Sequence, residues 1–209
     1  MKEAIVLLSG GIDSATCAYL IRGRYAMRAL TVEYHGITPG EVKASGRLAS
    51  AAGAVEHRRV KLPDMKEAAD MGARFPGLPA TYIPARNAVF YSLAGAYAEE
   101  VGADLIIGGH NRDDRRIFPD VGPGFLSAMQ AALRKGSPIL SSKGTRLAAP
   151  LGKMTKVQVI REANRLGVPL ELTWSCHRDE AWHCWHCAGC LARGKAFRAA
   201  RVRDPLREG

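Results

Sequence analysis

The stretch that decides the fold is Ala4-Ile5-Val6-Leu7-Leu8-Ser9-Gly10-Gly11-Ile12-Asp13-Ser14. Its five leading apolar residues indicate a strand buried on both faces, and Ser14 can cap the helix expected to follow through residue 21. Gly10 and Gly11 carry no Cβ and can adopt positive φ, so the backbone N–H groups of this turn can approach a ligand closely. Because free amides and a helix N-terminus favour an anion, the stretch predicts a phosphate site.

The turn itself, Ser9-Gly-Gly-Ile-Asp-Ser14, resembles the S-G-G-x-D-S signature of the PP-loop ATP pyrophosphatases, whereas the P-loop and dinucleotide fingerprints are absent from the sequence. The signature has no lysine to offset phosphate charge. An aspartate beside a triphosphate is repulsive unless a divalent cation lies between them, so Mg²⁺ near Asp13 is implied. The resemblance implies that ATP is held by Leu8, Ser9, Gly10, Gly11, Ile12, Asp13 and Ser14, with Ser9, Asp13 and Ser14 taking part in catalysis. A bare strand-to-helix turn is the alternative.

The composition is that of an ordinary globular protein, with 209 residues, 47% hydrophobic and 24% charged. We expect one main domain. The sequence contains no apolar run long enough to span a membrane, and the first strand starts at once, which leaves no room for a signal peptide. A cytoplasmic location is therefore predicted. The formal net charge of +10 permits binding to RNA or nucleotides, but a solvated basic surface explains it equally well.

The apolar periodicity predicts an α/β fold with a parallel sheet and helices on both faces, and the resemblance at Ser9–Ser14 implies that this fold is of the Rossmann-like, PP-loop type. Predicted strands are residues 4–8, 28–34, 55–62, 104–107 and 146–149, and further helices are predicted at 41–52, from 86–87 to 101, from 123 to before 136, and at 155–166. Residues 63–79 are predicted to be a mobile loop. We divide the chain into a nucleotide-binding domain, 1–170, and a C-terminal cysteine region, 171–209.

Substrate-binding candidates lie where the predicted strands end and a helix begins. Arg86 and Asn87 are at a helix entrance, where a guanidinium and an amide can face a ligand; the alternative is that Asn87 caps the helix and Arg86 is solvated. Ligands of open α/β sheets gather beyond strand carboxyl ends, which brings in the side chains that follow residue 107. The candidates are Arg86, Asn87, Asn111, Asp113, Asp114 and Asp120, with Arg86 also assigned to catalysis. His110 could act as a base, although a single histidine is more often structural.

Four of the five cysteines fall within residues 176–190: Cys176, Cys184, Cys187 and Cys190. Two consecutive C-x-x-C spacings and one more distant thiolate fit a structural Cys₄ zinc site, with an iron–sulfur cluster as the competing interpretation. His183 and His186 could replace a ligand, but a supporting role beside the thiolates fits better. Nearby Arg178, Arg193 and Lys195 could offset the negative charge. Cys17 is expected to be a small core residue.

The order of these motifs resembles the QueC family of 7-cyano-7-deazaguanine synthases over nearly the whole chain. The matching segments are Ser9-Gly-Gly-Ile-Asp-Ser14, Ile83-Pro-Ala-Arg-Asn87, Phe118-Pro-Asp120, Leu172-Thr-Trp-Ser-Cys176 and Cys184-x-x-Cys187-x-x-Cys190. The resemblance implies an ATP-dependent ligase that converts 7-carboxy-7-deazaguanine and ammonia into the nitrile preQ₀, a precursor of queuosine and archaeosine, through adenylate and amide intermediates. It also implies a structural zinc ion held by the four cysteines.

Three departures from the family pattern lie in expected substrate loops: Tyr34-His35-Gly36, Val121-Gly122, and residues 177–183. They leave open a related enzyme acting on another carboxylate. A tRNA-modifying PP-loop enzyme of the thiolation or lysidine type is a second class, and a non-catalytic zinc protein that binds RNA is a third. The expected partners are small molecules and a second copy of the chain in a homodimer, without a membrane. Direct RNA binding is not expected, because the sequence shows no appended RNA-binding domain.

Overall fold

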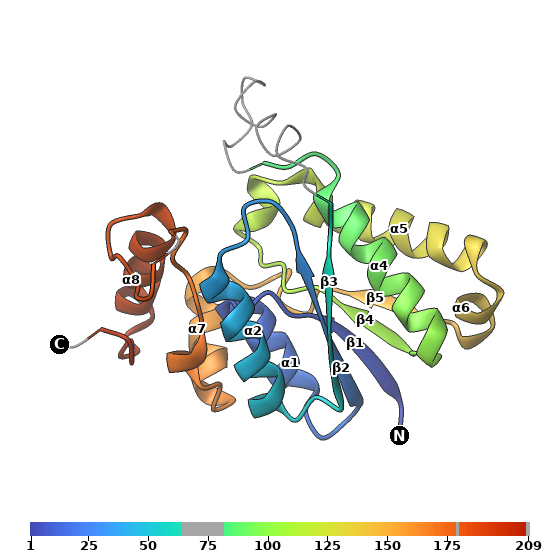
Figure 1. Cartoon of the computed structure of the whole chain (residues 1–209), viewed down its shortest axis with the longest axis horizontal. Coiled ribbons are helices and arrows are strands. Elements are labelled where there is room, and N and C mark those ends of the chain that lie inside the picture. The colour runs from blue at the N-terminus through green and yellow to red at the C-terminus, as the bar shows by residue number, and fades with distance from the viewer. Residues whose placement is uncertain (64–81, 179, 208–209) are drawn as a thin grey trace.

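The computed structural model describes residues 1–63, 82–178 and 180–207. Its centre is a parallel sheet in the order β3-β2-β1-β4-β5 (Figure 1). The strands are β1 (Glu3–Leu7), β2 (Ala26–Glu33), β3 (Glu56–Lys61), β4 (Leu105–Ile107) and β5 (Arg146–Ala148). This confirms the predicted parallel α/β fold and all five predicted strands. The predicted loop at 63–79 lies almost wholly outside the described residues.

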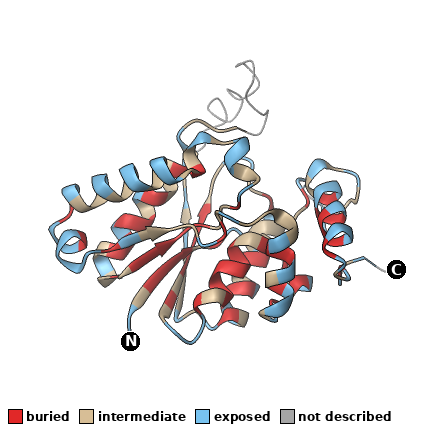
Figure 2. Ribbon diagram, turned by 180° about the vertical axis from the view of Figure 1, so that it is seen from behind, coloured by how far each residue is buried: buried red, intermediate tan, exposed pale blue. Residues whose placement is uncertain are grey.

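Helices cover both faces of the sheet, as the apolar runs of the strands require. One layer holds α1 (Ile12–Ile21), α2 (Pro39–Ala52) and α7 (Lys156–Arg165), and the other holds α4 (Arg86–Val101), α5 (Pro123–Gly136) and α6 (Pro138–Lys143) (Figure 1). Alternate residues of β1 enter different layers: Ala4 and Val6 belong to one core cluster and Ile5 to the other. Figure 2 shows the buried residues gathered on the sheet and the inner sides of these helices. Cys17 is fully buried, as expected.

The helix ends show which local rules hold. At α2 and α7, capping boxes join Thr38 to Glu41 and Thr155 to Gln158, and the second was predicted from its sequence. The predicted capping role of Ser14 is wrong. Helix α1 begins at Ile12 with Gly11 as its N-cap, so Ser14 lies inside the first turn. Its hydroxyl donates to the Gly11 carbonyl instead.

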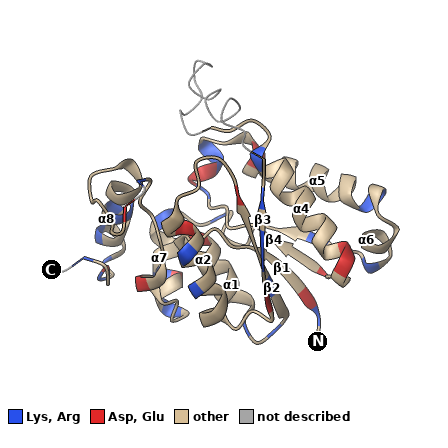
Figure 3. Cartoon of the chain, in the orientation of Figure 1, with Lys and Arg blue, Asp and Glu red and all other residues tan. Residues whose placement is uncertain are grey.

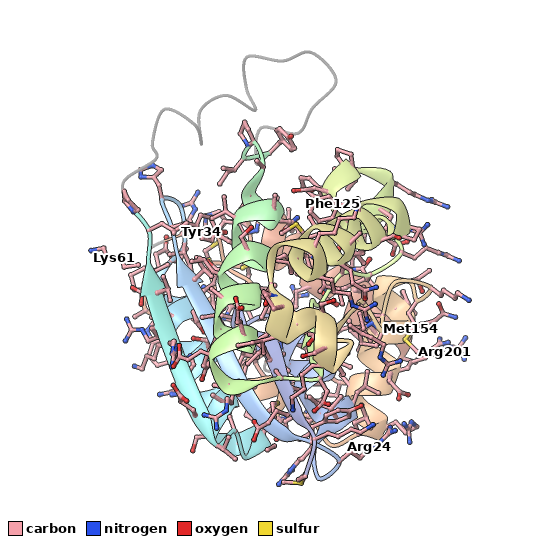
Figure 4. The ribbon with its side chains drawn as sticks, turned by 90° about the vertical axis from the view of Figure 1, so that its right-hand side faces the viewer. Arg24, Tyr34, Lys61, Phe125, Met154 and Arg201 are labelled. Carbon is pink, nitrogen blue, oxygen red and sulfur yellow. The ribbon has the colours of Figure 1, made fainter. Side chains whose placement is uncertain are left out.

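The carboxyl ends of the strands all lie at one end of the sheet, because the strands are parallel. Figure 4 shows Tyr34 after β2 and Lys61 at the end of β3 at this end, and Arg24 before β2 at the opposite end. The single-turn helices η2 (Asp114–Arg116) and η3 (Pro119–Val121) follow β4 there. Ligands are expected at this end of an open parallel sheet.

The C-terminal region follows the single turn η4 (Leu170–Leu172) and ends in α8 (Ala188–Ala200). Ala196, Phe197 and Ala200 belong to the same core cluster as β1 and α1, so α8 is packed against the main body. The boundary at residue 170 remains a prediction. Among the described residues, no helix is long and apolar enough to cross a membrane.

Candidate functional site

The loop between β1 and α1 is held by its own serines. The Ser9 amide donates to Ser14 Oγ at 3.2 Å, and Ser14 Oγ donates to the Gly11 carbonyl at 3.1 Å. Gly10 has φ of +90°, and a Cβ at this position would lie 2.4 Å from the Glu41 carbonyl oxygen. A side chain at Gly10 would therefore be both strained and in collision with α2. The loop can keep this shape only with glycine.

A cavity of about 630 Å³ opens beside the loop at the carboxyl end of the sheet. Its size and partly apolar lining fit a nucleotide or a small heterocycle. Much of the polar part of its wall comes from the β1–α1 loop, the segment after β2, the entrance of α4 and the end of β4, and Glu41 and His177 also contribute. The lining residues from these places include Ser9, Gly11, Asp13, Ser14, Tyr34, His35, Gly36, Arg86, Asn87 and His110.

A lysine from outside the loop, Lys156, forms an ion pair with Asp13. Its ammonium lies 2.5 Å from Asp13 Oδ2, although the two residues are 143 positions apart. The second oxygen, Asp13 Oδ1, is buried without a hydrogen-bond partner among the described residues. Such an oxygen is costly unless a ligand completes it, which fits a cation or water beside a bound phosphate. Sequence reasoning missed Lys156; its position at the first residue of a capped helix was the one available signal.

Arg86, Asn87 and Asp120 come together at the entrance of α4. The Arg86 guanidinium lies 5.6 Å from the Tyr34 ring centre, and Asn87 is 6% exposed. The backbone amide of Asn87 donates to Asp120 Oδ2 at 3.4 Å. The other oxygen, Asp120 Oδ1, is buried without a partner in the described chain. Asn87 does not cap the helix with its side chain, because the N-cap is Ala85. Arg86 and Asn87 therefore line the cavity, whereas Asp120 contacts Asn87 without being part of the wall that the described residues form.

Asn111, Asp113 and Asp114 form a compact turn after β4. Asn111 Oδ1 accepts from the amides of Asp113 and Asp114, and Asp114 Oδ2 accepts from the Asn111 amide. Asp113 Oδ2 accepts from the Lys156 amide at 2.9 Å, at the start of α7. None of the three is part of the cavity wall as the described residues form it. The turn therefore positions the Lys156 helix, and a direct substrate role for these residues stays a prediction.

His110 lies deep in the cavity wall, with its ring 5.9 Å from that of Tyr91. Its Nε2 has no hydrogen-bond partner in the described residues. Burial lowers the pKa of His110 to about 4, although the nearby Asp120 carboxylate opposes this. The ring is therefore neutral at pH 7 and can exchange a proton with a bound ligand.

The depressed pKa of His110 predicts a pH dependence of stability. The folded protein binds fewer protons than the unfolded chain between the unfolded pKa near 6.5 and the folded pKa near 4. The resulting stabilisation is present above pH 6.5 and is lost as the pH falls through 4. From pH 6.5 to 4, wild type should lose about 3 kcal/mol more unfolding free energy than His110→Gln, measured by urea denaturation. Equal losses of unfolding free energy in wild type and His110→Gln would mean that the His110 ring is exposed to solvent.

The four C-terminal cysteines converge as their spacing predicts. Their Sγ atoms all lie within 4.8 Å of one another, and the Cys176–Cys187 and Cys184–Cys190 pairs are 3.9 Å apart. Zn–S bonds of about 2.3 Å in a tetrahedron require sulfur atoms about 3.8 Å apart, so the residues fit a Cys₄ metal site. Cys187 is the N-cap of α8 and Cys190 is in its first turn. The amides of His177 and Cys187 point to sulfur and favour thiolates.

Neither neighbouring histidine joins this cluster. His183 Nε2 accepts from the Ser175 amide, and His186 Nδ1 lies 2.6 Å from the Cys184 carbonyl oxygen. The interpretation of Arg193 as a charge offset for the thiolates is wrong. Its buried guanidinium forms a two-pronged ion pair with Asp204, at 2.8 Å for each contact. Arg178 faces Glu180 at 3.6 Å, and Lys195 is exposed.

Solved structures define the class of this fold. The chain is similar to a U34-tRNA thiolase, NcsA, from Methanococcus maripaludis, with a TM-score of 0.54, 18% identity, and coverage of 96% of this chain and 70% of the other. It is also similar to a predicted subunit of tRNA methyltransferase from Methanocaldococcus jannaschii, with a TM-score of 0.53, 24% identity, and coverage of 78% and 75%. These likenesses show a shared α/β fold, and the Ser9–Ser14 segment in its first loop carries the sequence pattern of the PP-loop class.

The chain belongs to the QueC family. The family model described as "Queuosine biosynthesis protein QueC" matches residues 3–201, which confirms the resemblance found in the sequence. A 7-cyano-7-deazaguanine synthase from Thermoplasma acidophilum is 37% identical over 98% of this chain and 91% of its own length. One from Xanthomonas oryzae pv. oryzae is 38% identical over 98% of this chain and 97% of its own.

Proposed function

We propose that this protein is an ATP-dependent 7-cyano-7-deazaguanine synthase, which converts 7-carboxy-7-deazaguanine and ammonia into a nitrile. Family membership supports the enzyme class. The observation that carries the reaction is the cavity, which is lined by the nucleotide loop and by Arg86 and Asn87, with Asp120 hydrogen-bonded to the Asn87 backbone. Such a cavity can hold the reacting ends of a nucleotide and an anionic heterocycle together.

The chemistry requires activation, because a carboxylate is a poor electrophile. Attack of the carboxylate oxygen on the α-phosphate of ATP gives an acyl-adenylate and pyrophosphate. Ammonia displaces AMP to give an amide, and a second adenylation of the amide oxygen allows it to leave, which forms the nitrile. The amides of residues 9–14 are proposed to hold the phosphates, and Mg²⁺ beside Asp13 would offset their charge. Lys156 is proposed to contribute the charge that the loop lacks.

The heterocycle is proposed to lie against the opposite wall. Arg86 offsets the negative charge of its carboxylate, and Asp120 accepts from the donor edge of a guanine-like ring. Neutral His110, in the same wall, can take a proton from the attacking ammonia. Asn87 is part of the same wall, and its side-chain amide is proposed to bind the heterocycle.

Most of the residues that depart from the family pattern lie at the cavity. Tyr34, His35 and Gly36 line the cavity, and so does His177, whereas Val121 is buried in η3. The cavity-lining residues Tyr34, His35, Gly36 and His177 are therefore suited to select among acids of similar size. Measuring ATP consumption with a panel of deazapurine carboxylic acids, with and without ammonium, tests the substrate assignment. The proposal expects the largest stimulation with 7-carboxy-7-deazaguanine and ammonium together, and a larger response to another acid would replace the substrate.

A tRNA-modifying reaction is the second candidate, favoured by the likeness to the thiolase over 96% of this chain. Against it, basic residues are distributed over β3, α6, α7 and α8, which lie in different parts of the molecule, so they do not single out one RNA-binding face (Figure 3). ATP consumption that depends on added tRNA and ignores the acid would support this candidate. The cytoplasmic location and the homodimer remain predictions.

One zinc ion per chain is predicted at the four cysteines. Replacing Cys176 or Cys190 with serine should abolish stoichiometric zinc and lower the unfolding temperature, because a closed Cys₄ site contributes its binding free energy to folding. Elemental analysis and thermal denaturation provide the readouts. Cys17→Ser, on α1 and away from the cluster, is the control and should keep its zinc. Iron with acid-labile sulfide in anaerobically purified protein would contradict zinc and favour the thiolation class.

A further inference from the structure

Trp174 lies between the cysteine cluster and the nucleotide loop and is hydrogen-bonded to both. Its backbone amide donates to the Gly10 carbonyl at 2.9 Å. Its indole Nε1 donates to the carbonyl of Cys176 at 2.8 Å, so the same residue contacts the backbone of a metal ligand. Trp174 therefore joins the Gly10 carbonyl, through its backbone amide, to the Cys176 carbonyl, through its indole.

The indole ring has little freedom to move. A Cβ at Gly40, in the first turn of α2, would lie 2.2 Å from the ring, so the ring rests directly on the helix backbone. The indole also contacts the ring of His183, at 4.4 Å between ring centres, and His183 is the residue before Cys184 in the sequence. Gly10 is confined by the same helix, where its missing Cβ would meet the Glu41 carbonyl. The loop and the indole thus both pack on the N-terminal part of α2, and the indole is in turn hydrogen-bonded to Cys176.

The connection also reaches the cavity. His177 follows Cys176, its backbone amide faces Cys187 Sγ at 3.4 Å, and it is one of the residues that line the cavity. A shift of the backbone at Cys176 would therefore change both the indole hydrogen bond and the cavity wall. Packed networks of this kind can transmit a binding free energy between two sites.

We propose that Trp174 is a positioning residue that couples metal binding at the four cysteines to nucleotide binding at the Ser9–Ser14 loop. A filled cluster fixes the Cys176 carbonyl, which holds the indole, and the Trp174 amide then holds the Gly10 carbonyl so that the loop amides face the cavity. Coupling between two sites is reciprocal in affinity, so bound nucleotide must tighten metal binding, and we expect this to be seen as slower metal loss. The inference rests on the proposed role of the loop as the nucleotide site.

The test measures zinc release from the zinc-loaded full-length protein to a chelating dye, with and without α,β-methylene-ATP and excess Mg²⁺. In wild type, the nucleotide should slow release about fivefold or more, within the usual range of coupling. In Trp174→Phe, which keeps an aromatic ring but has no Nε1 donor, this ratio should fall to about one, and nucleotide affinity should weaken severalfold. Trp182→Phe is the matched control, because Trp182 is 81% exposed; it should keep the wild-type ratio.

The outcomes separate coupling from simple stability. If Trp174→Phe lowers the unfolding temperature but keeps the wild-type ratio of release rates, Trp174 is only structural and the proposal is overturned. Nucleotide binding to wild type without any change in zinc release would overturn it as well, while leaving the proposed function intact. Wild type that binds no nucleotide would remove both the coupling and the assigned nucleotide loop.

Discussion

Replacing Lys156 with alanine is expected to lower kcat/KM for the ATP-dependent reaction by about 10²–10³-fold, the usual cost of removing one charged or donor group aimed at developing charge. Lys156 is the cation found beside the loop aspartate, at 2.5 Å, and the loop itself contains no lysine. Without it, Asp13 and the phosphates would repel each other with less compensation. Steady-state kinetics over a range of ATP concentrations provide the measurement.

The control is Lys153→Ala, which removes an exposed lysine three residues earlier and should leave kcat/KM within about twofold of wild type. Circular dichroism of both variants checks that the fold is retained. Because the Asp113 carboxylate is bonded to the Lys156 backbone amide, the helix start does not depend on the Lys156 side chain. Wild-type turnover by a folded Lys156→Ala variant would exclude the lysine from the phosphate site.

Replacing Arg193 with methionine is expected to lower the free energy of unfolding by about 3–5 kcal/mol, the usual cost of removing one partner of a buried ion pair. The Arg193 side chain is 1% exposed and Asp204 is 5% exposed. The guanidinium also donates to Thr173 Oγ1 at 2.7 Å and to the Leu170 carbonyl at 3.1 Å. The substitution would leave the Asp204 carboxylate buried without its cation and would remove one donor each from Thr173 Oγ1 and the Leu170 carbonyl, and urea denaturation measures the loss.

Arg198→Met is the matched control for this prediction. Arg198 is exposed on the same helix, so its removal should change the unfolding free energy by less than about 1 kcal/mol. The double variant Arg193→Met with Asp204→Leu should recover part of the loss, because no unpaired charge remains buried. A loss below about 1 kcal/mol for Arg193→Met alone would mean that the ion pair is not formed in solution.

The fold could be predicted because its signals are local. Five apolar strands, a capping box at Thr155 and glycine stops at residues 53 and 167 each lie within a few positions of the element they specify. The short helix α6 was not predicted; it has only six residues and one buried side chain, Leu140, too few for a periodic pattern. Ser14 was misplaced because the helix starts two residues earlier, where Gly11 provides the N-cap without a side chain.

The candidate site was predictable only where its residues are close in sequence. The cysteines lie within one short segment, and their spacing alone brought them together. Lys156 and Asp13 meet only after the sheet forms, and Trp174 meets Gly10 only when the C-terminal segment packs on α2. Arg193 illustrates the opposite error: closeness to the cysteines in sequence indicated a charge offset, whereas burial commits its guanidinium to Asp204.

The most direct test of the central claim is the identity of the product. The purified, zinc-loaded protein should be incubated with 7-carboxy-7-deazaguanine, ATP, Mg²⁺ and ¹⁵N-ammonium, and the products separated by mass spectrometry. We expect a nitrile that carries one ¹⁵N atom and is lighter by one water than the corresponding labelled amide. Recovery of the unchanged acid, with ATP consumed only when tRNA is added, would contradict it.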